Sequence, residues 1–284
     1  MSAEKMTSGQ CCKKCLMLLV LVLASASNVF ALDIDVALLG DSNTWIAGEN
    51  CEKDTGWPFW FKQEFAPRSC SNLSRSGATW VNTENTRYDI KENIEVLGDN
   101  NVIYNQVNRL IDEVKRGTQP TPQLIIVAAG VNDVWFAKKR PHAMDVQPLE
   151  AYMRSAVLKT RHPSRVLSLS ESIVYSAGML RDAFPRAAVV LVTPVETVNC
   201  APHDIHQASD VMEETARLLG WGVVRLDRLS PVKSEQEKAA FNYTYDGTHT
   251  SVLGAREHAR IIVDALNEIM MQKKSQRQLT DGIF

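Results

Sequence analysis

Val36-Ala-Leu-Leu-Gly-Asp-Ser-Asn-Thr44 is the stretch on which the prediction of the fold rests. Its first four residues are all apolar, which indicates a strand buried on both faces of a parallel sheet. Ser42 stands directly after this strand, and open α/β sheets place their binding and catalytic residues at the carboxyl ends of their strands. Ser42 is therefore a candidate nucleophile, although serine and aspartate are also common turn and helix-capping residues.

Four further expected strands alternate with helical patterns along the chain. The expected strands cover residues 70–76, 124–129, 188–193 and 222–226. The expected helices cover residues 56–65, 102–114, 164–184, 204–219 and 251–271. Between them, residues 81–100 are expected to form an exposed loop and residues 134–163 a long connection. Strands that alternate with helices, without an internal repeat, predict a doubly wound parallel sheet.

The N-terminus has the layout of a secretory signal peptide. The pair Lys13-Lys14 precedes the apolar run 16–24, and the small residues that follow end in a suitable cleavage site at Ala31. This run is too short to span a bilayer comfortably, and an uncleaved N-terminal anchor is the alternative. We expect residues 1–31 to be removed and residues 32–284 to form one domain, because no linker divides them.

The charge and composition of the mature chain exclude several classes of partner. Residues 1–31 contain three of the 31 basic and one of the 33 acidic residues, so 28 and 32 remain. This mild negative charge gives no basis for binding nucleic acid or anionic membranes. His203 and His206 are better explained by the start of a helix than by a metal site. We expect no cofactor, no metal, no nucleic-acid partner and no membrane contact after signal removal; the oligomeric state stays open.

Three cysteines, Cys51, Cys70 and Cys200, follow the expected cleavage site. In an oxidising compartment, a disulfide between Cys51 and Cys70 would close a short loop, with a stabilisation of roughly 3 kcal/mol on the chain-entropy model. Three unpaired thiols are the alternative, because a sequence does not give the distance between two cysteines.

Tyr245-Asp-Gly-Thr-His249 precedes the last expected helix. An aspartate three residues before a histidine, in a turn held by Gly247, can bring its carboxylate to the imidazole Nδ1. The imidazole Nε2 is then free to face a serine, which is the geometry of general-base activation. A turn aspartate followed by a helix-capping histidine explains the same residues without any chemistry. Taken alone, this motif is therefore ambiguous.

Four blocks of sequence, taken together, resemble those of the SGNH hydrolase family, also called GDSL esterases. They are Gly40-Asp-Ser42 after the first strand, Ser76-Gly77 after the second, Gly130-Val-Asn-Asp133 after the third, and Asp246-Gly-Thr-His249 before the last helix. Their order and spacing match the family over nearly all of the mature chain. The resemblance implies a flavodoxin-like three-layer α/β/α sandwich with a five-stranded parallel sheet.

The resemblance also implies a role for each block. Ser42 is then the nucleophile, His249 the general base, and Asp246 the residue that orients the imidazole. The backbone N–H groups of Ser42 and Gly77 and the side-chain amide of Asn132 form the oxyanion hole. This agrees with the chemistry of acyl transfer, because preorganised N–H donors commonly stabilise the developing oxyanion by several kcal/mol. Glycine lets the backbone approach closely, and asparagine donates hydrogen bonds without carrying a charge.

One residue departs from the family pattern. The leucine that commonly follows Gly-Asp-Ser is replaced by Asn43, which we expect to affect packing more than chemistry. The departure leaves the nucleophile in place, but it puts the subfamily in doubt and argues against a lipase. Asp41 and Asp133 are expected to support turns rather than to act in catalysis.

Three tryptophans, Trp45, Trp80 and Trp135, each lie within three residues of a block residue. Their flat rings suit a sugar face, although packing beneath the loops explains them at least as well. We therefore expect an exported serine esterase that removes short acyl groups, acetyl above all, from a small-molecule or polysaccharide ester. A lysophospholipase or thioesterase is the alternative enzyme, and a non-catalytic glycan-binding module is the alternative of another class.

Overall fold

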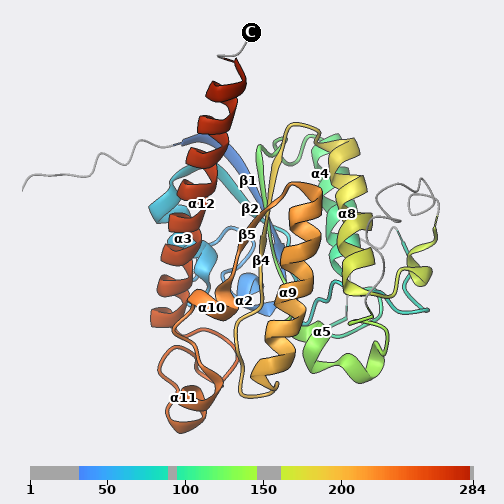
Figure 1. Ribbon diagram of the computed structural model, residues 1–284, viewed down its shortest axis with the longest axis vertical. Coiled ribbons are helices and arrows are strands. Elements are labelled where there is room, and N and C mark those ends of the chain that lie inside the picture. The colour runs from blue at the N-terminus through green and yellow to red at the C-terminus, as the bar shows by residue number, and fades with distance from the viewer. Residues whose placement is uncertain (1–31, 89–94, 146–160, 282–284) are drawn as a thin grey trace, which may run out of the picture. The chain divides into compact units, whose positions relative to one another are not determined.

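The computed structural model describes residues 32–88, 95–145 and 161–281 (Figure 1). The expected signal peptide, residues 1–31, lies outside this range, as do residues 146–160 of the expected long connection. Among the described helices, none is both long enough and apolar enough to cross a bilayer.

Five parallel strands form the sheet, in the order β2-β1-β3-β4-β5 (Figure 1). They are β1 (Leu32–Gly40), β2 (Pro67–Asn72), β3 (Leu124–Ala128), β4 (Ala188–Val192) and β5 (Gly222–Val224). The register places Leu38 opposite Ile126 and Ile126 opposite Val190. The strand order reverses between β1 and β3, which is where open α/β sheets form their ligand sites. The predicted five-stranded parallel sheet is confirmed.

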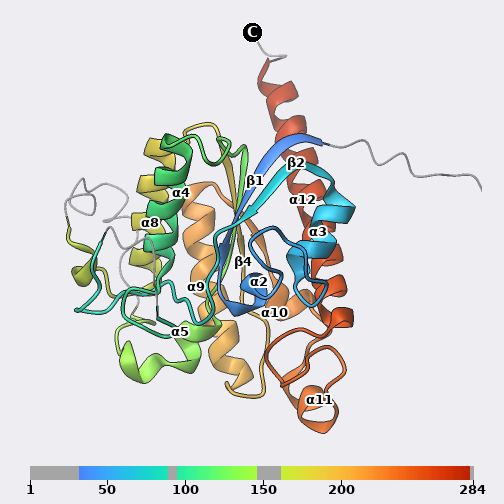
Figure 2. The same ribbon diagram turned by 180° about the vertical axis from the view of Figure 1, so that it is seen from behind.

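Helices cover both faces of the sheet, and Figures 1 and 2 show α3 and α12 on one face and α4, α8 and α9 on the other. The longer helices are α3 (Trp57–Phe65), α4 (Ile103–Lys115), α8 (Leu169–Ala183), α9 (Pro202–Leu219) and α12 (Val252–Asp281). The shorter ones are α2 (Ser42–Trp45), α5 (Val131–Trp135), α10 (Leu226–Leu229) and α11 (Ser234–Ala239), with 3-10 helices η1 (Ala137–Lys139) and η2 (Pro163–Arg165). This is the three-layer sandwich that the resemblance implied.

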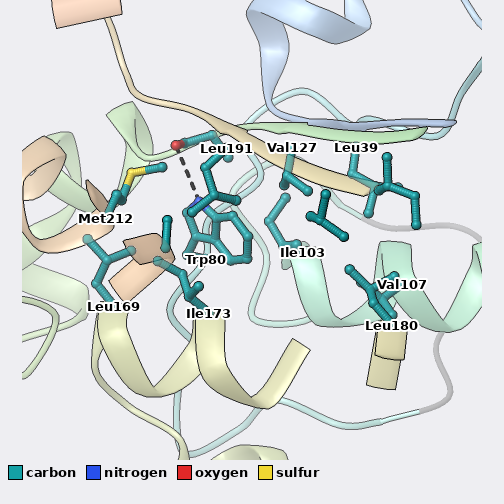
Figure 3. Packing of buried hydrophobic residues seen from close by; sticks show 14 of the residues in the cluster. Leu39, Trp80, Ile103, Val107, Val127, Leu169, Ile173, Leu180, Leu191 and Met212 are labelled. Atoms are coloured by element: carbon teal, nitrogen blue, oxygen red, sulfur yellow. Dashed lines mark hydrogen bonds between the residues drawn. The ribbon is translucent and has the colours of Figure 1, made fainter. Parts of the chain in front are cut away.

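The two faces of β1 explain why its sequence does not alternate between apolar and polar residues. Ala37 and Leu39 point into the core under α4, α8 and α9, whereas Val36 and Leu38 point into the core under α3 and α12. Successive side chains of a strand lie on opposite faces, so a strand covered on both faces needs a continuous apolar run. The side of the sheet that α4, α8 and α9 cover is shown in Figure 3.

The bounds of two elements differ from the predictions. Strand β2 begins at Pro67 and ends at Asn72, although Leu73 and Arg75 still donate backbone hydrogen bonds to the carbonyls of Leu38 and Gly40. Helix α8 begins five residues later than predicted, because Ser168 and Glu171 form a capping box that sets its start.

Two further predictions were wrong. The stretch after residue 80 is not an exposed loop throughout, because Val81, Asn82 and Thr86 are buried. Helix α12 continues to Asp281 instead of ending near Met271, since the Lys, Gln and Arg residues of this tail favour helix.

Candidate active site

Ser42 is the first residue of α2, directly after β1, and the end of the strand is fixed by several contacts. The side chain of Gln106 accepts a hydrogen bond from the Gly40 N–H and donates one to the Gly40 carbonyl, both at 2.8 Å. A Cβ atom at Gly40 would lie 2.4 Å from the Ala128 carbonyl oxygen, so only glycine fits there. Asp41 caps α2 by accepting the Asn43 N–H at 3.1 Å. Ser42 itself is 5% exposed and is held at the carboxyl edge of the sheet.

His249 and Asp246 lie together in a tight turn, residues 246–250, which we call the histidine turn. His249 Nδ1 lies 2.7 Å from Asp246 Oδ2, and Asp246 Oδ1 accepts the backbone N–H groups of Thr248 and His249. Burial opposes ionisation of Asp246, but these hydrogen bonds outweigh it and lower the pKa of the carboxyl. The carboxylate is therefore ionised at neutral pH and holds the imidazole with Nε2 directed away from it.

The side chain of Asn43 joins the nucleophile to the histidine turn. Its Nδ2 donates to the Thr248 carbonyl and its Oδ1 accepts the Thr250 N–H, both at 3.2 Å. Within the described residues, no hydrogen bond links Ser42 Oγ to His249 directly. Hydrogen bonds between a catalytic base and its nucleophile are often long before substrate binds, so this absence does not argue against the pairing.

The second and third blocks contact each other directly. Gly77 is buried with a φ of +76°, a conformation that favours glycine, and a Cβ there would lie 2.9 Å from the Leu97 nitrogen. Asn132 is 4% exposed, and its Nδ2 donates to the Ala78 carbonyl at 2.9 Å. An amide NH₂ has two hydrogens, so one of them fixes the loop beside Gly77 and the other stays available for an oxyanion.

Asp133 supports the same loop from beneath. Its two carboxylate oxygens accept the backbone N–H groups of Trp80 and Val81 at 3.0 and 2.9 Å. Burial raises the pKa of Asp133 to about 6, against the opposing effect of these hydrogen bonds and of the Arg140 guanidinium. Burial also raises the pKa of Asp41 to about 7; the Asn43 N–H opposes this and the charge of Asp133 adds to it. Two buried carboxylates therefore lie beneath the candidate site.

The three tryptophans do not share one environment. Trp45 and Trp135 are 44% and 37% exposed, so each presents part of its ring to solvent. Trp80 is only 1% exposed, and Figure 3 shows it among Leu191, Ile173 and Met212 of the core. Its indole N–H donates to the Ala129 carbonyl. The prediction that Trp80 binds substrate was therefore wrong, because a ring buried in the core offers no face to a sugar.

Sequence reasoning missed three residues of this region. Tyr245 is 56% exposed and stacks on the His249 ring, with 5.7 Å between ring centroids and 16° between planes. Its place directly before Asp246 was the signal in the sequence that could have identified it. Gln106 and the contacts of Asn43 left no signal, because their partners lie 66 and more than 200 residues away in the chain.

The other candidate clusters are not linked to the site. Cys51 and Cys70 lie with their sulfur atoms 3.8 Å apart, and both are free thiols here, as is Cys200. His206 Nδ1 faces Asp227 at 2.9 Å. In the described part of the chain, no group of three His, Cys, Asp or Glu side chains is arranged to hold a metal ion.

Comparison with known proteins gave a family and a fold. The model of the GDSL-like lipase/acylhydrolase family matches residues 38–257. A search of curated protein sequences gave no match. Solved structures with the same fold include a protein from Bacteroides uniformis described as a GDSL-like lipase (18% identity, TM-score 0.52, covering 83% of this chain and 96% of that one). A protein from Chitinophaga pinensis described as a lipase is similar, with 15% identity and a TM-score of 0.54, covering 84% of this chain and 99% of that one. An acetyl xylan esterase is also similar, with 16% identity and a TM-score of 0.51, covering 82% of this chain and 99% of that one.

Proposed function

Because the chain belongs to the GDSL-like lipase/acylhydrolase family, we propose that it is a serine esterase that removes short acyl groups, acetyl above all, from a carbohydrate. The observation that carries this proposal is the Asp246–His249 pair, 2.7 Å apart, in a turn that hydrogen-bonds to the residue after Ser42. A serine, a histidine and an aspartate in this arrangement are the parts of a nucleophile activated by a general base.

The mechanism follows from these positions. Ser42 Oγ attacks the ester carbonyl while His249 Nε2 takes its proton, and the ionised Asp246 stabilises the imidazolium that forms. The backbone N–H groups of Ser42 and Gly77 and the free N–H of Asn132 stabilise the oxyanion. His249 then gives its proton to the leaving alcohol, and a water molecule, activated in the same way, releases the acyl group from Ser42.

The preference for a carbohydrate rests on this chain's own residues, since neighbours at 16% identity share only the fold. Trp45, Trp135 and Tyr245 are exposed and lie on segments that also carry Ser42, Asn132 and His249. Aromatic faces of this kind suit the apolar face of a sugar ring. A polar hollow of about 560 Å³, lined in part by Asn82, Asp99 and His142, adds hydrogen-bonding groups on the segment that follows the second block in the chain.

Chain-length profiling tests the activity. We expect kcat/KM on p-nitrophenyl esters to be highest for acetate and butyrate, and acetate to be released from acetylated polysaccharide or peptidoglycan. The Ser42→Ala variant is the matched control for non-enzymatic release. A preference for long acyl chains or for thioesters would identify the lysophospholipase or thioesterase instead, and glycan binding without any turnover would identify a binding module.

We also propose that the protein is exported and that its signal peptide is cleaved after Ala31. The first strand begins at Leu32, so the proposed cleavage would remove nothing from the described fold. Mass spectrometry of the natively expressed protein should then give an N-terminus near Leu32. Protein that still carries residues 1–31 would contradict cleavage.

A further inference from the structure

The side-chain amide of Asn43 contacts the backbone on both sides of His249. Its Oδ1 accepts the N–H of Thr250 and its Nδ2 donates to the carbonyl of Thr248, each at 3.2 Å. A donor and an acceptor on one planar group thus pair with two backbone groups that flank a single residue. Because Asn43 is bonded covalently to Ser42, this pairing ties the candidate base to the candidate nucleophile.

The remaining contacts hold the histidine turn to other parts of the molecule. Asp246 binds the turn from within, and Asn199 donates to Thr248 Oγ1 at 2.9 Å. Thr250 Oγ1 donates to the Thr55 carbonyl at 2.7 Å. These bonds fix the turn against the loop after β4 and the loop before α3. Among the described hydrogen bonds, those of Asn43 are the ones that join the turn to the first residues of α2.

Asn43 is itself held in position. Its backbone N–H donates to the Asp41 carboxylate, and α2 follows a strand end that Gln106 fixes on both sides of Gly40. The side chain therefore projects from a rigid base. The pairing also needs an amide: aspartate keeps the acceptor and loses the donor, whereas leucine, the common residue at this place in similar sequences, loses both.

We propose that Asn43 is a positioning residue that sets the alignment of His249 Nε2 with Ser42 Oγ. The proposal rests on the esterase function argued above. A misplacement of about 1 Å by a residue outside the chemistry can cost about a hundredfold in rate, because proton transfer needs aligned partners. Asn43 does not touch the substrate in this role, so its loss should act on kcat and leave KM nearly unchanged.

The test compares Asn43→Leu and Asn43→Asp with the wild-type enzyme on p-nitrophenyl acetate. We expect kcat to fall by about 10- to 100-fold in both variants, with KM within about twofold. The control is Gln123→Leu, which removes a side-chain oxygen that accepts the backbone N–H of Asp35 at the opposite end of the sheet. It should lower the melting temperature without changing kcat. Wild-type kcat in Asn43→Leu, or an equal loss in Gln123→Leu, would overturn the proposal.

Hydrogen exchange gives a second readout that does not depend on turnover. In Asn43→Leu the Thr250 amide should exchange at least about tenfold faster, because its acceptor is gone, while amides of α8 remain unchanged. Unchanged exchange at Thr250 would overturn the proposal even if activity fell. If the wild-type protein hydrolyses no ester, the proposed function fails, and the exchange of Thr250 still decides whether Asn43 holds the turn.

Discussion

The two halves of the candidate site are built differently. Ser42 and Asn132 follow the buried strands β1 and β3 and are 5% and 4% exposed, so strand pairing and burial fix them. The histidine turn has one isolated bridge, between Thr244 and Thr250, and one backbone bond, from the Val198 N–H to the Gly247 carbonyl; its other contacts are side-chain hydrogen bonds. Backbone pairing survives most substitutions, whereas each side-chain bond is lost with one residue. The nucleophile side should therefore tolerate change in its surroundings better than the histidine side.

The carboxyl groups of the two halves also differ in their burial and in the direction of their pKa shifts. The carboxyls beneath the nucleophile, Asp41 and Asp133, are buried and have raised pKa values. The carboxyl of the histidine turn, Asp246, has a side chain 41% exposed and a lowered pKa. Of these three carboxyls, only Asp246 is arranged to be charged when its partner histidine becomes protonated.

The largest effect is expected from the nucleophile itself. Ser42→Ala should lower kcat by about a millionfold, because the attacking oxygen is absent and the rest of the machinery has nothing to activate. The change is from one small buried residue to another, so circular dichroism should report an intact fold. Turnover near that of the wild type would refute the assignment.

On the histidine side, Asp246→Asn should cost about 10⁴-fold in kcat. The amide keeps an oxygen for the N–H groups of Thr248 and His249, but its NH₂ cannot accept from Nδ1, so the imidazole takes the wrong tautomer. Steady-state kinetics with matched circular dichroism measure this. A loss smaller than about tenfold would show that Asp246 does not orient the imidazole for catalysis.

On the strand side, two substitutions of Asn132 separate a role in the oxyanion hole from a role in the geometry of the turn. Asn132→Ala should lower kcat by about 100- to 1000-fold and leave KM nearly unchanged, because its N–H meets the oxyanion only as charge develops. Asn132→Asp should be at least as damaging, since a carboxylate cannot donate to the Ala78 carbonyl and repels the oxyanion. Wild-type kcat in Asn132→Asp would remove Asn132 from the oxyanion hole.

The smallest effect is on stability rather than rate. Asp41 has an ordinary pKa of 3.8 and a folded value of about 7, so between these limits the folded state holds a proton that the unfolded state has lost. Stability therefore falls as pH rises through this window, by about 1.4 kcal/mol per pH unit at most. Asp41→Asn cannot ionise and keeps an acceptor for the Asn43 N–H. In urea unfolding, the free energy of unfolding of Asp41→Asn, relative to that of the wild type, should therefore grow from pH 4 to pH 7.

The exposed Asp54 supplies the control for this pH series, because Asp54→Asn changes a carboxyl on the surface of the same region. Its stability should follow the wild-type pH dependence. Parallel pH curves for Asp41→Asn and the wild type would contradict the raised pKa of Asp41.

The sequence predicted the strand side of the site better than the histidine side. The apolar run from Val36 to Leu39 depends only on the two covered faces of the sheet, so a local pattern was enough to find β1. Trp80 was misplaced because an aromatic residue in a loop gives no sign of whether the loop folds over the core. Asn43 was assigned to packing because its partners, 205 and 207 residues away, leave no local pattern.

The distance in sequence between Asn43 and the histidine turn also governs when a newly made chain becomes active. A ribosome that adds 5–20 residues per second completes Ser42 and then needs about 10–40 s to reach Thr248, 205 residues after Asn43. For that time the nascent chain carries a nucleophile without a base, under the roles proposed here. Helix α12, which packs beside α3 (Figure 1), follows later still. Under these roles, the growing polypeptide stays hydrolytically silent until the histidine turn has been translated.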